Sequence, residues 1–156
     1  MEPITSSILL TIKKMLGIAE EYHAFDIDVM TNINSVFLTL NQLAVGPETP
    51  YSISSDEETW EDFLGSSKVD LPGVQTYVFM KTRLLFDPPT NSFLVDAMQN
   101  QCNELEWRLN LQAERREKNE PDEVESRRAE RRARRMASRN QRNEVGRTKN
   151  TGTAGS

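Results

Sequence analysis

Few side chains of this 156-residue chain have the type and spacing that catalysis would need. Its one histidine, His23, has Glu20, Glu21 and Asp26 close in sequence, and a general base would need such a carboxylate to orient the ring. A solvated histidine among acids is the more common arrangement. Its one cysteine, Cys102, excludes an intrachain disulfide and a multi-cysteine zinc site and has no histidine or asparagine at a recognisable distance. We expect Cys102 to be a structural thiol, and we expect no catalytic residue and no enzyme.

A run of carboxylates is the second chemical candidate. Oxygen ligands of this kind suit a hard cation, and they occur at Asp56, Glu57, Glu58, Glu61 and Asp62. The spacing matches no calcium loop, however, and no glycine lies where a tight ligand loop would need one. The sequence therefore predicts a solvated acidic loop, or one that meets a basic neighbour, with no metal and no cofactor.

The C-terminal part carries an arginine run that could bind anions. Between Arg127 and Lys149, ten basic residues stand against two acidic ones, and arginine outnumbers lysine nine to one. The planar guanidinium suits paired contacts with carboxylate or phosphate. Three interpretations stay open: docking on an acidic protein surface, contact with a nucleic-acid backbone, or a solvated tail. No aromatic residues interleave to stack on bases, which argues against single-strand recognition. The candidate docking residues are Arg127, Arg128, Arg131, Arg132, Arg134, Arg135 and Arg139.

The charges divide the chain into two parts. Residues 1–113 hold six Lys or Arg against sixteen Asp or Glu, and residues 114–156 hold thirteen against eight. Such asymmetry is typical of two functions. We expect a helical domain over 1–118 and a basic arm over 119–156. No apolar stretch approaches the length of a membrane span, and no signal peptide is recognisable, so we expect a cytoplasmic protein without a membrane.

The elements that would position these residues are helices. Apolar residues at helical spacing predict helices over 3–16, 25–44, 71–86 and from Thr90 or Asn91 to about 118, with Glu120-Pro121 as the stop. Pro3 would lie in the first turn of the first helix and Gly17 would cap its end. The segment 46–73 reads as an irregular loop with one or two helical turns at 59–64, capped by Ser55 or Asp56. The prediction is an all-α, four-helix domain with a long final helix and an extended or helical Arg-rich tail.

Five residues are candidates for contacts between subunits. Trp60 and Trp107 are each either core residues or interface anchors, because tryptophan is enriched at interfaces. The loop 46–73 would face a neighbour, and Arg108 directly follows Trp107. The predicted interface residues are Tyr51, Ile53, Trp60, Trp107 and Arg108.

The order of these segments resembles a known family. A first helix ends in Lys13-Lys14-Met15-Leu16-Gly17, a second opens on Phe25-Asp26-Ile27-Asp28, and a corner follows at Phe86-Asp87-Pro88-Pro89 before a long helix with Glu104-Leu105-Glu106-Trp107-Arg108-Leu109. Residues 1–113 are similar to the head–tail connector, or adaptor, proteins of tailed bacteriophages.

The resemblance implies a structural virion protein at the head–tail interface, assembled in the host cytoplasm. It implies a homo-oligomeric ring, commonly of twelve subunits, that binds the portal protein on one side and a stopper or tail protein on the other. Viral genome ejection would pass DNA through the lumen without sequence-specific binding, and an acidic wall would not grip it. We expect the arginine arm to dock on the portal. The alternative is a nucleic-acid-binding or DNA-packaging accessory protein that acts through its basic tail as a monomer or dimer.

Overall fold

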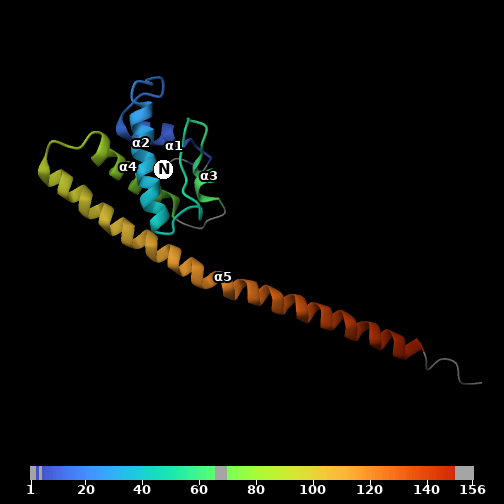
Figure 1. The fold of residues 1–156 in the computed structure, drawn as a ribbon. Coiled ribbons are helices and arrows are strands. Elements are labelled where there is room, and N and C mark those ends of the chain that lie inside the picture. Colours follow the sequence, from blue (N-terminus) through green and yellow to red (C-terminus); the bar gives the residue numbers. More distant parts are fainter. Residues whose placement is uncertain (1–2, 4, 66–69, 150–156) are drawn as a thin grey trace, which may run out of the picture. The chain divides into compact units, whose positions relative to one another are not determined.

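The computed structural model describes residues 3, 5–65 and 70–149, with the side chains of 116–128 and 135–149 left out. These residues form five helices and no strand: α1 (Ile8–Leu16), α2 (Asp26–Gln42), α3 (Trp60–Leu64), α4 (Leu71–Phe86) and α5 (Ser92–Lys149) (Figure 1). The predicted all-α fold is confirmed. Contacts group the chain into two compact units, residues 1–115 and 116–156. The functional division predicted at 118/119 stays a prediction.

Local hydrogen bonds decide where α1 begins and ends. The Ser7 hydroxyl accepts from the Leu10 backbone N–H at 3.3 Å and caps the helix, so α1 starts at Ile8. The prediction that Pro3 lies in its first turn is wrong, because the Pro3 carbonyl instead accepts from Ser6 N–H in a preceding turn. Gly17 ends the helix with a φ of +79°, as predicted, because glycine adopts this left-handed conformation without steric cost.

The short helix α3 lies inside the segment predicted to be irregular. Its cap is Thr59, whose hydroxyl accepts from Asp62 N–H while the Asp62 carboxylate accepts from Thr59 N–H at 2.8 Å. The predicted caps Ser55 and Asp56 are therefore wrong. This reciprocal arrangement satisfies the backbone N–H groups of both Thr59 and Asp62, and α3 lies within the helical turns predicted at 59–64.

The last helix is longer than predicted. Asn91 caps it, as expected, by accepting from Phe93 N–H at 2.9 Å, but α5 continues through Pro121 to Lys149. The expected end near residue 118 is wrong. One interior proline removes one backbone hydrogen bond, whereas the following Glu-, Arg- and Ala-rich residues favour helix. Of the two forms predicted for the tail, the helical one is present over residues 119–149.

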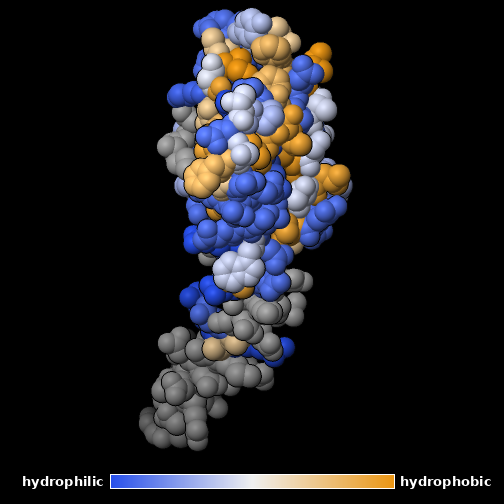
Figure 2. Space-filling model, turned by 90° about the vertical axis from the view of Figure 1, so that its left-hand side faces the viewer, coloured by the Kyte–Doolittle hydropathy of each residue, from blue (hydrophilic) through white to orange (hydrophobic). Residues whose placement is uncertain are grey.

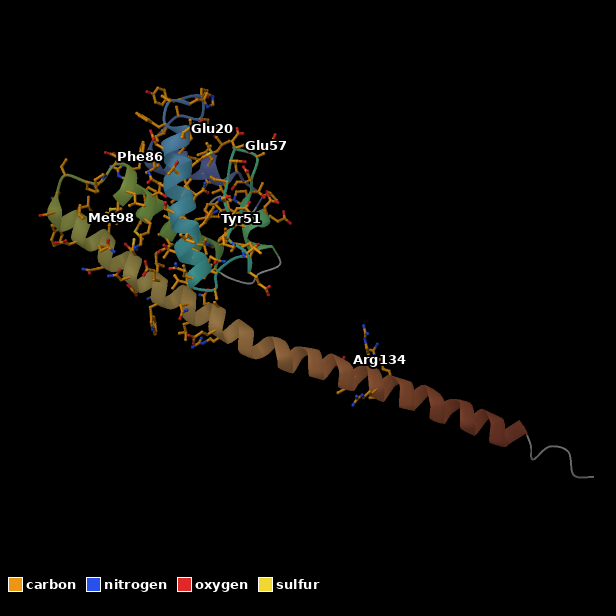
Figure 3. The ribbon with its side chains drawn as sticks, viewed as in Figure 1. Glu20, Tyr51, Glu57, Phe86, Met98 and Arg134 are labelled. Atoms are coloured by element: carbon orange, nitrogen blue, oxygen red, sulfur yellow. The ribbon has the colours of Figure 1, made fainter. Side chains whose placement is uncertain are left out.

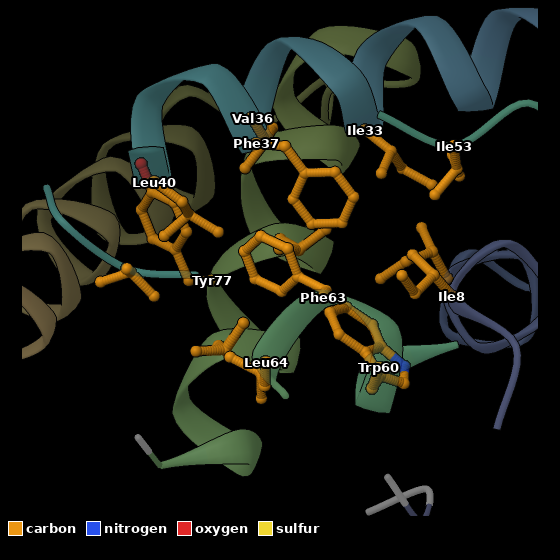
Figure 4. Close-up of a cluster of buried hydrophobic side chains, with 14 of the residues drawn as sticks. Ile8, Ile33, Val36, Phe37, Leu40, Ile53, Trp60, Phe63, Leu64 and Tyr77 are labelled. Carbon is orange, nitrogen blue, oxygen red and sulfur yellow. The ribbon is translucent and has the colours of Figure 1, made fainter. Parts of the chain in front are cut away.

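The core of the first unit gathers side chains from all five helices. Helices α1, α2 and α4 pack against one another, and α3 inserts aromatic rings beneath them (Figure 4). Phe63 stacks on Phe37 with ring centroids 4.4 Å apart. Trp60 is fully buried, and its ring N–H donates to Thr11 Oγ1 at 3.3 Å. Since truncating a buried aromatic costs about 3–5 kcal/mol, these rings anchor the segment 46–65 to the bundle.

Candidate docking surfaces

Helix α5 attaches to the first unit along one narrow stripe. Cys102, Leu109 and Ala113 are buried, and Met98 and Leu105 are partly buried against the core. Spacings of three and four residues place these side chains on one side of the helix. The opposite side of this part of α5, which carries Trp107, is exposed.

A polar cluster reinforces the stripe. Glu106 on α5 accepts from the Tyr77 hydroxyl at 2.7 Å and pairs with Lys81 Nζ at 2.9 Å, both residues of α4. Burial by itself would raise the pKa of Glu106, but the bonds from Lys81 and Tyr77 outweigh it and lower that pKa. Burial first, and then the bond to Glu106, raise the pKa of Tyr77. The carboxylate thus stays charged and joins the two helices. Burial likewise raises the pKa of the Cys102 thiol, as expected of a structural cysteine.

The arginine run lies on the helical second unit. Arg131, Arg132 and Arg134 are exposed, as are Ala129 and Glu130 (Figure 3, where Arg134 is labelled). The side chains of Arg127, Arg128, Arg135 and Arg139 lie outside the described ones. Helical geometry spreads a run of this density over a broad face, so the exposed guanidinium groups can bind a surface rather than a single ion. Their docking role stays a prediction.

The five residues predicted at subunit interfaces separate into two groups. Trp60 and Ile53 are buried inside the chain, at 0% and 3% exposure, so neither offers side-chain surface to a neighbour. Asn34 holds Ile53 by exchanging two hydrogen bonds with its backbone, at 2.8 and 3.0 Å. Tyr51 is half-buried against Phe63. Trp107 is 65% exposed and Arg108, paired with Glu104, is exposed beside it. A role between subunits remains a prediction for Tyr51, Trp107 and Arg108.

The acidic loop is organised from within. Glu58 turns toward Ser54 and Ser55, and the backbone N–H and hydroxyl of each donate to its carboxylate at 2.8–3.1 Å. Burial opposes ionisation of Glu58, but these four bonds prevail and lower its pKa to about 2. Two bonds from Thr59 lower the pKa of Asp62 as well. Among the residues that the structure describes, no three His, Cys, Asp or Glu side chains come together as a metal site requires.

The neighbourhood of His23 contains an ion pair that the sequence analysis missed. Lys13 is buried, pairs with Asp26 Oδ1 at 2.6 Å and donates to the Glu20 carbonyl at 3.0 Å. His23 Nδ1 lies 2.8 Å from the other Asp26 oxygen. The bond from Lys13 is the main cause that lowers the pKa of Asp26. Lys13 follows the core residue Leu9 by four positions, so its register on α1 was the available signal. The arrangement closes the α1–α2 loop.

Aromatic and aliphatic side chains also gather at the surface where this loop meets the end of α4. Phe25 lies 5.4 Å from both Tyr22 and Phe86, measured between ring centroids. Tyr22, Phe25 and the adjacent Leu85 are 50%, 41% and 56% exposed. Figure 2 shows hydrophobic groups interspersed with hydrophilic ones on one face of the molecule. Sequence reasoning did not find this patch, because its members come from two separate segments.

Comparison with known proteins identifies the family. The phage connector protein family matches residues 8–116, which is most of the first compact unit. No curated protein and no solved structure matches the chain. In the part of the chain that the structure describes, no helix is both long and apolar enough to cross a membrane. Proteins of the matched family are structural parts of the phage virion at the connection between head and tail. This chain belongs to the phage connector protein family.

Proposed function

We propose that the chain is a head–tail adaptor that forms a homo-oligomeric ring, binds the portal protein and joins it to a tail or stopper protein. The observation that carries this proposal is the family match over residues 8–116. The match ends where the second unit begins, so the arginine arm lies outside the matched residues. A ring of about twelve subunits, as the resemblance implies, would leave a central channel for DNA during genome ejection.

The charge of the first unit supports a role around moving DNA. Residues 1–113 hold sixteen carboxylates against six cations. Of these cations, Lys13 is buried, and Lys81 and Arg83 are paired with Glu106 and Asp87. A wall of this sign repels phosphate and provides few cationic sites for the counterion release that binding to DNA would require. DNA would therefore pass without being held.

The arm supports attachment to the portal. Exposed guanidinium groups at Arg131, Arg132 and Arg134 can each form two parallel bonds with a carboxylate. An acidic portal surface would be their partner, and such contacts weaken as salt screens them. The arm would leave the acidic first unit free to face the channel and the neighbouring subunits.

Light scattering after size exclusion tests this function. The full chain is expected to assemble into a ring and to bind the purified portal protein of the same phage. The variant Arg131→Gln/Arg132→Gln should bind the portal at least tenfold more weakly, whereas Arg116→Gln/Lys118→Gln, with the same charge loss outside the run, should bind normally. A chain that stays monomeric and ignores the portal contradicts the adaptor function.

The second candidate, a DNA-packaging accessory protein, rests on the same arginine run. Nine arginines over 127–149 are enough to hold a nucleic-acid backbone electrostatically. This function predicts binding of the full chain to duplex DNA with a steep salt dependence, as a monomer or dimer, and no affinity for the portal. The adaptor function instead predicts that the chain binds the portal protein more tightly than duplex DNA at 0.15 M salt. Nonspecific DNA binding is weak at this salt concentration, with a Kd of about 10⁻⁴–10⁻⁶ M.

A further inference from the structure

The first unit presents two exposed surfaces whose chemistry is complementary. One is the aromatic patch, formed by Tyr22, Phe25, Leu85 and Phe86. The other is the Trp107 face of α5, formed by Asn103, Trp107 and Arg108. They belong to different elements: the patch joins the α1–α2 loop to the end of α4, whereas the Trp107 face lies on the first part of α5. A contact between them would require two copies of the chain.

The aromatic patch can accept an aromatic side chain. Its rings already meet edge to face, with interplanar angles of 62° and 70°, and this geometry is favourable for adding another ring at about 5 Å. Its surroundings are acidic, with exposed carboxylates at Glu20, Glu21 and Asp28. Figure 3 labels Glu20 and Phe86, which lie at the same end of the unit. An apolar centre with a negative rim favours an aromatic residue accompanied by cations.

The Trp107 face has that composition. Trp107 lies about half a turn around α5 from Met98, Leu105 and Leu109, so it points away from the stripe that packs on the core. Arg108 and Arg115 lie seven residues apart and follow one edge of this face. They are the two exposed arginines among the described residues of the first unit. A tryptophan with arginines beside it is the usual composition of an interface anchor.

We propose that Trp107 of one copy packs on the aromatic patch of the next copy, with Arg108 and Arg115 directed to its acidic rim. This inference rests on the proposed function, because it names the contact that would build the ring. The contact joins two different surfaces, so each copy contacts one neighbour through Trp107 and the other neighbour through its aromatic patch. Repeating this contact makes a closed ring when the rotation between adjacent copies divides a full turn evenly. The contact also brings opposite charges together between two copies whose acidic first units otherwise repel each other.

Mixing two interface variants tests the contact in the full chain. Trp107→Ser removes one surface, and Tyr22→Ser/Phe25→Ser removes the other. Each variant alone is expected to remain at the monomer mass of 17.8 kDa at concentrations where the unchanged chain assembles. An equal mixture is expected to form particles of two chains and no larger, because each variant keeps the surface that its partner lacks. Leu38→Ser, which removes another exposed side chain, should assemble normally.

The outcomes separate this inference from the proposed function. Formation of the two-chain particle also demonstrates that both variants are folded. If the unchanged chain assembles and the variants assemble equally well, or if their mixture stays monomeric, the Trp107 contact is overturned and the ring remains. If the unchanged chain does not assemble, alone or with portal protein, the ring fails and the contact fails with it.

Discussion

Two features require glycine at position 46: the positive φ of its backbone and the close approach of the Phe63 ring. The φ of Gly46 is +94°, and a Cβ atom built there would lie 2.5 Å from Cε2 of Phe63. Phe63 cannot move aside freely, because it stacks on Phe37 and contacts Tyr51. Gly46→Ala therefore adds a steric cost to the backbone cost. Gly17 is the matched control, since its φ is +79° but nothing lies within 4 Å of its Cβ position.

The expected magnitudes follow from these two terms. An alanine with positive φ costs about 1–2 kcal/mol, which is the whole effect expected for Gly17→Ala. Overpacking a core adds about 1–3 kcal/mol, so Gly46→Ala should lower the free energy of unfolding by about 2–5 kcal/mol. Urea unfolding of both variants, followed by circular dichroism at one fixed protein concentration, provides the comparison. Equal losses for the two variants would refute the packing of Phe63 beneath the α2–α3 loop.

Three further predictions concern the charged groups that hold the fold. Glu106→Gln should lower the free energy of unfolding by about 1–3 kcal/mol at pH 7, and Tyr77→Phe by about 1 kcal/mol, both measured in urea. A larger loss for Tyr77→Phe than for Glu106→Gln would contradict the conclusion that the Glu106 carboxylate joins the two helices. Because the pKa of Glu58 falls from 4.5 to about 2 on folding, its contribution is complete above pH 4.5 and is lost as the pH falls toward 2. After a discount for solvent exposure, the ionised Glu58 contributes about 1–2 kcal/mol to the free energy of unfolding. Glu58→Gln should therefore reduce the difference in free energy of unfolding between pH 7 and pH 3. An unchanged difference would refute this role of Glu58. Lys13→Met should lower the free energy of unfolding by about 2–4 kcal/mol in thermal unfolding, because it leaves Asp26 Oδ1 and the Glu20 carbonyl without their donor. A neutral result would show that the ion pair contributes nothing to stability.

The sequence predicted the elements whose ends are marked by local chemistry. The helix over 71–86 agrees at both ends because Pro72 suits a first turn and Asp87-Pro88-Pro89 cannot continue a helix. Gly17 and Asn91 were found for the same reason. The end of the last helix was missed because one proline was weighted above the helix-forming residues that follow it.

The surfaces were harder to predict because exposure depends on packing between distant segments. Trp60 and Trp107 had the same two interpretations in the sequence, yet one lies at the centre of the core and the other is 65% exposed. Periodicity marks a helix face but does not say which partner covers it. The aromatic patch needed the contact between Phe25 and Phe86, which are far apart in sequence. The burial of Lys13 likewise depends on Asp26 across the α1–α2 loop.

The proposed ring of this chain would lie between the portal and the tail. Electron cryo-microscopy of the head–tail junction of the phage tests it most directly. We expect a ring of helical subunits next to the portal, with an open centre, and α2, α4 and the first part of α5 should fit its density. A junction in which portal and tail proteins touch without this chain between them would contradict it.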